Sequence, residues 1–134
     1  MGGVFASQMA MGAVYATQAG FSLGQISTFI AAIYIGAVAF QMPIGWISDH
    51  IDRRKAIFGV AGMGTAACLV GILIPGNYVL VLGIAFVAGG AANPLYSLLI
   101  AHTNDYLDPE DMAASSGGLL FINGVGAVGG PLIA

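Results

Sequence analysis

The chain has 134 residues, of which 58% are hydrophobic and 7% are charged, with a net charge of -3 and a mean hydropathy of +0.92. Soluble domains carry about a quarter charged residues, so three basic and six acidic side chains are too few to solvate a soluble domain of this size. The sequence has no stripe of basic residues of the kind that favours nucleic-acid binding. The single cysteine, Cys68, excludes an internal disulfide and a multi-cysteine metal site. The composition therefore indicates an all-α, polytopic transmembrane helical bundle.

Five apolar stretches follow one another along the chain, each close to the roughly 20 residues that a membrane-spanning helix needs. We place these spans at about residues 1–18, 23–47, 55–74, 78–101 and 112–134. Ser22 is expected to be the N-cap of the second helix. Ser48–Arg54 is predicted to be a tight charged turn, and Pro75–Asn77 is a strong turn signal. The connection His102–Asp111 is polar and acidic.

The basic residues predict an orientation. All three, Arg53, Arg54 and Lys55, fall between the second and third spans, and such residues favour the cytoplasmic side. We therefore expect the loops Ser48–Lys55 and His102–Asp111 to be cytoplasmic, in a multi-pass protein of a cell membrane, the bacterial inner membrane.

A charged motif joins the second and third spans and reads GWISDHIDRRK, from Gly45 to Lys55. It resembles the signature loop of the major facilitator superfamily (MFS) of transporters, G-x-x-x-D-(R/K)-x-G-(R/K)-(R/K). Gly45 and Asp49 match the opening glycine and the acid, and Arg53 and Arg54 match the basic pair. In that superfamily the loop lies between helices 2 and 3 and, more weakly, between helices 8 and 9.

The match to this loop is partial, because His50 replaces a basic residue of the signature and Asp52 replaces its glycine. The resemblance implies that the loop latches one half of a transporter against the other. Asp49 is well placed to face the positive N-terminal end of a neighbouring helix. We expect the two arginines to pair with Asp49 or Asp52, with lipid phosphates or with helix C-terminal carbonyls. The alternative is that the basic residues only set the topology.

Three segments of the second half carry a closer resemblance. Asn93–Ser97, Ala101–Asp105 and Ala114–Leu120 resemble the C-terminal half of a YcaD-type branch of transporters. The resemblance implies that residues 1–134 are helices 7 to 11 of a twelve-helix protein. We therefore expect a fragment that lacks the N-terminal half and the last helix.

The fifth span ends in a glycine motif. Gly126 and Gly130 form a G-x-x-x-G pattern, which favours close helix packing, and Pro131 follows as a potential kink. The motif resembles one found in superfamily antiporters. Tight packing is the structural alternative to an antiport role.

Uncharged polar side chains recur on four of the five spans, whereas the third span has few. In the superfamily helices 7, 8, 10 and 11 line the cavity, and helix 9 lies outside. The candidate cavity-lining residues are Gln8, Tyr15, Tyr34, Gln41, Asn93, Tyr96 and Asn123. Amides and phenols suit a ligand with polar and apolar parts. The alternative is that each forms a hydrogen bond between helices.

No acidic or basic side chain lies well inside any span, so a proton-coupling carboxylate is expected in the missing half. His102 is expected to be an interfacial cap. We predict no catalytic residue, metal or cofactor, because no cluster suited to chemistry is present.

Two functions remain open at this point. The first is a fragment of a secondary active transporter, working on a small-molecule substrate by alternating access. Its partners are then the lipid bilayer and the missing N-terminal half. The second is a small stand-alone helical membrane protein that acts as an oligomeric scaffold or sensor.

Overall fold

The computed structural model describes residues 1–74 and 77–133, and within these it is an all-α bundle, as predicted. The helices are α1 (Gly2–Gln18), α2 (Leu23–His50), α3 (Arg53–Leu73), α4 (Tyr78–Asn104) and α5 (Met112–Ile133). Helices α2 to α5 are long and apolar enough to cross a membrane. α1 has 17 residues, or about 26 Å at 1.5 Å per residue, which is shorter than the roughly 30 Å hydrocarbon core.

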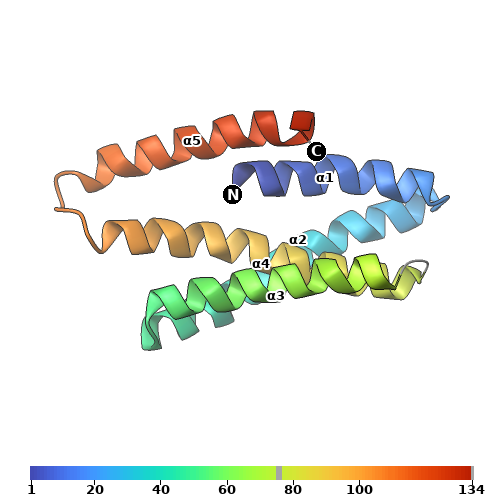
Figure 1. Ribbon diagram of the computed structural model, residues 1–134, viewed down its shortest axis with the longest axis horizontal. Coiled ribbons are helices and arrows are strands. Elements are labelled where there is room, and N and C mark those ends of the chain that lie inside the picture. Colours follow the sequence, from blue (N-terminus) through green and yellow to red (C-terminus); the bar gives the residue numbers. More distant parts are fainter. Residues whose placement is uncertain (75–76, 134) are drawn as a thin grey trace.

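The helices form two packed groups (Figure 1). In one group α4 packs against both α2 and α3, and in the other α1 packs against α5. Smaller contacts of α1 with α2 and α4 join the groups. The α2–α3 and α4–α5 connections lie at the same end of the bundle (Figure 1). The two loops that were expected to be cytoplasmic therefore share one end.

Local hydrogen bonds fix the helix starts. Ser22 begins α2 through a capping box, in which its backbone N–H donates to Gln25 Oε1 at 2.9 Å. Gly20 turns the chain just before it with a φ of 75°, a backbone conformation that glycine adopts without strain. The Asn77 side chain accepts from the backbone N–H groups of Val79 and Leu80 in the first turn of α4. The predicted cap at Ser22 is thus confirmed, whereas Pro75 and Gly76 lie outside the described residues.

The predicted charged turn at Ser48–Arg54 is wrong in its extent. α2 continues past the hydrophobic stretch, because the backbone N–H of Ile51 still donates to the Ile47 carbonyl at 3.0 Å. The carboxylate of Asp52 then caps α3 by accepting from the second backbone N–H of that helix at 2.9 Å. Asp49 therefore lies on a helix and not in a turn.

Prolines inside the spans do not end the helices. Pro43, Pro94 and Pro131 all lie within helices, since neighbouring groups in a membrane bundle can satisfy the freed carbonyls. α4 continues beyond its predicted end at residue 101 as far as Asn104. His102 is consequently in the last turn of α4.

Glycines bring the backbones of α2 and α4 into direct contact. A Cβ atom on Gly36 would collide with the Phe86 carbonyl oxygen, and one on Gly89 would collide with that of Ile33. A Cβ on Gly90 would lie 3.1 Å from the Gly36 carbonyl oxygen. Small residues are what allow helices to approach so closely in lipid.

The largest buried cluster joins α2, α3 and α4. It consists of Ile44, Ala56, Val60, Ala91, Leu95 and Leu98. Ala56 and Val60 come from the start of α3, and Leu95 and Leu98 come from the second half of α4, so this cluster holds the start of α3 against α4. A second cluster, of Phe29, Ile33 and Ala85, packs the other end of α2 against α4.

We predict that Gly89→Ala destabilises the protein, because the new methyl group would meet the backbone of α2. Overpacking of this kind costs about 1–3 kcal/mol. The measurement is thermal unfolding of the full-length protein in detergent. Gly83→Ala is the matched control on the same helix, since nothing lies within 4 Å of its Cβ position. Equal unfolding temperatures for the two variants would contradict the close contact.

Candidate functional site

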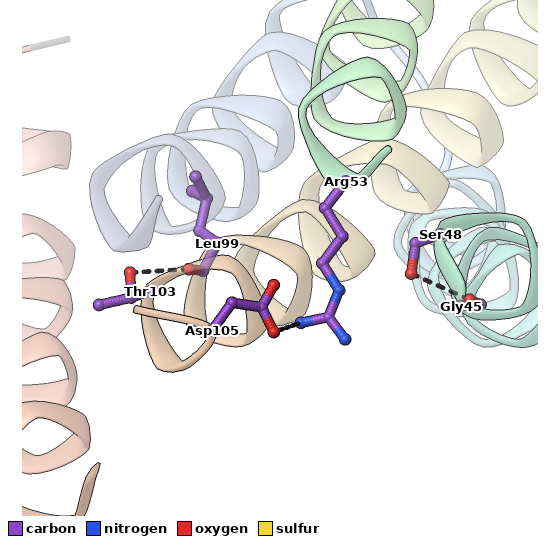
Figure 2. Close-up of polar contacts among 6 residues, drawn as sticks. All are labelled: Gly45, Ser48, Arg53, Leu99, Thr103 and Asp105. Atoms are coloured by element: carbon purple, nitrogen blue, oxygen red, sulfur yellow. Dashed lines mark hydrogen bonds and ion pairs between the residues drawn. The ribbon is translucent and has the colours of Figure 1, made fainter. Parts of the chain in front are cut away.

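The two arginines of the charged motif contact the chain at the end of α4. Arg53 Nη1 donates to Asp105 Oδ1 at 2.9 Å, and the two side chains are 29% and 46% exposed (Figure 2). Arg54 Nη2 lies 3.2 Å from the Tyr106 hydroxyl oxygen and donates to it. These contacts tie the start of α3 to the chain that leaves α4.

The helix dipoles explain why the ion pair between Arg53 and Asp105 is favourable. Arg53 opens α3 and places a cation at a helix N-terminus, where the dipole is positive. Asp105 is the C-cap of α4 and places an anion where the dipole is negative. Each charge alone is unfavourably placed, and the pair offsets both effects. The ion pair therefore depends on α3 packing beside α4.

The predicted partners of the arginines are wrong for Arg53, because it pairs with Asp105 and not with Asp49 or Asp52. The sequence interpretation did not single out Asp105 or Tyr106. A signal was present, since the basic loop and the acidic loop were both expected on the same side of the membrane.

The other half of the motif is uncovered. Asp49 is exposed, and no side chain among residues 1–74 and 77–133 hydrogen-bonds to its carboxylate. Nothing described lies within 4 Å of a Cβ placed on Gly45. Ser48, between them, is buried and donates to the Gly45 carbonyl at 3.0 Å (Figure 2). Gly45 and Asp49 thus lie on a surface free to meet another part of the protein.

His50 lies against the exposed Trp46 ring, with ring centroids 4.4 Å apart. Its Nδ1 is 2.7 Å from the Trp46 carbonyl oxygen, which can only accept, so Nδ1 is the donor. The residue that replaces a basic position of the signature is therefore anchored to its own helix.

Three candidate cavity residues are exposed on α1 and α2, namely Tyr15, Tyr34 and Gln41. The Tyr34 ring meets Phe5 of α1 edge-on, with centroids 6.3 Å apart. The structure thus places these three side chains on the outside of the described bundle.

The candidates on α4 and α5 are half-buried. Asn93 and Tyr96 flank the buried Pro94. Asn123 packs at the α1–α5 crossing, where a Cβ on Gly2 would collide with its carbonyl oxygen. Its Oδ1 is buried and has no hydrogen-bond partner among the described residues.

The glycines of α5 also meet α1. A Cβ on Gly3 would lie 3.0 Å from the Gly126 carbonyl oxygen, and a Cβ on Gly130 would lie 2.6 Å from the Gly3 Cα. The G-x-x-x-G motif therefore lies at a backbone contact between the two helices.

A groove of about 970 Å³ lies between α1, α3 and α4, with the end of α5 at its border. Its walls include Gln8 and Met11 of α1, Gly64 and Cys68 of α3, and Ala92 of α4. Gln8 is the one candidate cavity residue in its lining, and α2 contributes none of the lining residues. The groove is therefore not the cavity expected from the sequence, in which α2 was to form a wall and α3 was to lie outside.

Comparison with known proteins identifies the family. The family model of the Major Facilitator Superfamily matches residues 1–134. The chain belongs to this superfamily. It is 30% identical over 103 residues to YfkF of Bacillus subtilis (strain 168), which is described as an uncharacterized MFS-type transporter. The match covers 77% of this chain and 26% of YfkF, so it spans about a quarter of that relative's length. No solved structure matches the chain.

Membership of this superfamily and the four apolar helices make the chain part of a multi-pass membrane protein. The five helices are a partial bundle of the superfamily fold.

We predict a small coupling energy for the Arg53–Asp105 pair. Exposed ion pairs contribute about 0.2–1 kcal/mol, and both side chains reach solvent. A double-mutant cycle of Arg53→Gln and Asp105→Asn, read from unfolding of the full-length protein, measures this energy. Pairing Arg53→Gln with Asp108→Asn, which removes another exposed acid of the loop, is expected to give zero coupling. Equal values in the two cycles would contradict a specific pair.

Proposed function

We propose that residues 1–134 form helices 7 to 11, in the C-terminal half of a secondary active transporter that moves a small molecule by alternating access. The superfamily match along the whole chain supports this, as does the printed description of YfkF as a transporter. Alternating access needs two halves that exchange contacts around a central site. In this proposal the five described helices belong to one of the two halves.

The observation that carries the proposal is the division of the charged motif into a fixed part and a free part. Arg53 and Arg54 are bound to the end of α4. Asp49 is exposed on the neighbouring helix end, beside the open surface at Gly45. A contact of Asp49 with the N-terminal half that forms in only one state would bias the equilibrium between inward-facing and outward-facing states. In this proposal such a state-dependent contact of Asp49 is the latch.

The substrate surface is proposed to include Tyr15, Tyr34 and Gln41. They are exposed in the described bundle, so they are free to meet a ligand or the other half. Phenol and amide groups on an apolar surface suit an uncharged or weakly polar small molecule. The half-buried candidates Asn93 and Asn123 fit helix–helix contacts better. No acidic or basic residue lies well inside a span, which favours a coupling carboxylate elsewhere in the protein.

We place the protein in the bacterial inner membrane and in the YcaD-type branch, with both charged loops cytoplasmic. The clustering of Arg53, Arg54 and Lys55 supports this orientation. Their contacts with the α4–α5 connection support a common side for the two loops. A stand-alone scaffold or sensor is disfavoured by the transporter family to which the chain belongs.

We predict that Asp49→Asn in the full-length transporter slows the conformational cycle more than it weakens substrate binding. Removing the charge weakens a contact between the halves but leaves the substrate surface intact. Counterflow or uptake assays are expected to show a maximal rate at least several-fold lower with a nearly unchanged Kd.

The matched control is Asp108→Asn, an exposed acid of the α4–α5 connection with no side-chain hydrogen bond among the described residues. It is expected to transport normally. If Asp49→Asn also transports at the normal rate, the latch role is contradicted. The remaining interpretation is then that the loop only sets the topology.

The orientation is tested by cysteine labelling in vesicles. Arg54→Cys is expected to react with a membrane-impermeant maleimide only from the cytoplasmic side. Leu23→Cys, at the exposed opposite end of α2, is expected to react only from the outside. The reverse pattern would overturn the proposed sidedness.

A further inference from the structure

His50, the last residue of α2, is held in a way that leaves one ring nitrogen free. Its Nδ1 donates to the Trp46 carbonyl oxygen at 2.7 Å. Its Nε2 has no hydrogen-bond partner among the described residues, and His50 is exposed. Nδ1 carries a hydrogen in this neutral form and also in the protonated imidazole, so a proton can bind at Nε2 without breaking the contact. Protonation therefore changes the charge of His50 and leaves its anchor in place.

The surroundings of His50 accommodate a cation as well as a neutral ring. The residue lies in the last turn of α2, at the negative end of the helix dipole. The Trp46 ring lies against it, with the two ring centroids 4.4 Å apart, and an indole ring attracts a cation at such a distance. The helix end can thus hold His50 in either charge state.

The charged groups at this end of the bundle come from α2, α3 and the α4–α5 connection. Beside His50 they are Asp49, Asp52, Arg53, Arg54, Lys55, His102, Asp105, Asp108, Glu110 and Asp111. Neither α1 nor α5 contributes a charged residue. In the described part of the chain Arg53 pairs with Asp105, and no carboxylate forms an ion pair with His50.

Asp49 is the acid that a charge on His50 adjoins most directly. The two residues are neighbours at the end of α2, and both are exposed. Asp52, by contrast, is engaged as the cap of α3. Adjacent residues on a helix do not face each other, so a charge on His50 acts on the surroundings of Asp49 through space and not by pairing with it.

We propose that His50 makes the contact of Asp49 sensitive to the pH on the side of the membrane that the charged loop faces, a role that rests on the latch proposed for Asp49. The partner of a carboxylate is a positive group, such as a basic side chain or a helix N-terminus. A proton on His50 adds a positive charge beside Asp49, which repels that partner and weakens the latch. Acidification of that side therefore shifts the equilibrium away from the latched state.

The pH range follows from the residue type. Histidine ordinarily changes its charge between about pH 5 and 8, whereas carboxylates, lysine and arginine ordinarily keep theirs at neutral pH. The signature to which this motif was compared has a permanently basic residue where this chain has His50. A permanent cation acts equally at every such pH, so the histidine turns a constant charge into a variable one.

The experiment follows the cover over Asp49 with a cysteine at Met42. Positions 42, 45 and 49 share one face of α2, and Met42 is 83% exposed in the described bundle. The full-length protein, with Cys68→Ser and Met42→Cys and any further native cysteines replaced, is placed in lipid nanodiscs. The measurement is the rate at which a water-soluble maleimide modifies position 42 at pH 6 and at pH 8. The latched state covers this face, so a weaker latch is expected to raise the rate.

Two variants define the charge states of position 50. His50→Gln is always neutral and His50→Arg is always charged. The protein with His50 is expected to match His50→Gln at pH 8 and His50→Arg at pH 6. At pH 6 its rate is expected to exceed that of His50→Gln by about twofold or more, as expected for neighbouring surface charges. Comparing the proteins at one pH cancels the pH dependence of the maleimide reaction itself.

Two controls separate this role from others. His102→Gln removes the other histidine of the described residues and is expected to leave the pH response unchanged. Loss of the response in that variant would assign it to His102 and overturn the proposal. Asp49→Asn is expected to raise the rate at both pH values.

The possible failures are distinguishable. If Asp49→Asn leaves the rate unchanged, the latch role is overturned, and the role of His50 with it. If Asp49→Asn raises the rate, but the ratio between the His50 protein and His50→Gln is the same at both pH values, the latch stands and the role of His50 alone is overturned. Because His50 is exposed, both variants at position 50 are expected to fold, and either comparison alone tests the proposal.

Discussion

Direct backbone contact between helices is the constraint on which this structure depends. Lipid is as apolar as a leucine side chain, so burial of apolar surface does not drive helices together within the membrane. Association then relies on dispersion between closely approaching backbones. Gly36 and Gly89 make that approach possible between α2 and α4. Once α4 is fixed against α2, the buried face of α3 has a surface on which to pack.

The number of helices and most of their limits could be predicted, because a helix that crosses the hydrocarbon core needs a stretch of roughly 20 apolar residues. The end of α2 could not be predicted, because hydropathy indicates where the apolar stretch ends and not where the helical hydrogen bonds end. The charges after Ile47 ended the predicted span, yet Ile51 still donates into the helix. The cap at Ser22 was predictable because its hydrogen bonds are local in sequence.

The site was less predictable than the fold, because its contacts join residues far apart in the chain. Asp49 and Asp52 are near Arg53 in sequence, so they were its natural candidate partners. Asp105 is 52 residues away, and it meets Arg53 only because α3 packs along α4. The surroundings of the candidate cavity-lining residues could not be predicted for a related reason, because polar residue type does not reveal which face of a helix is covered. Of these residues Gln8 lines the groove, whereas Tyr15, Tyr34 and Gln41 are exposed on α1 and α2.

The ion pair at the end of α4 adds to the packing that joins three helix ends. Arg53 and Arg54 bind the α4–α5 connection, and Ile44, Val60 and Leu98 belong to the buried cluster that joins α2, α3 and α4. The start of α3, the end of α2 and the end of α4 are thereby held together by both charge and packing. In the proposed latch role, a contact made or lost at Asp49 would act on all three helix ends at once and not on a flexible loop. Packed elements respond to such a bias by shifting between discrete arrangements, so the proposal assigns the effect of one carboxylate to the three packed helix ends together.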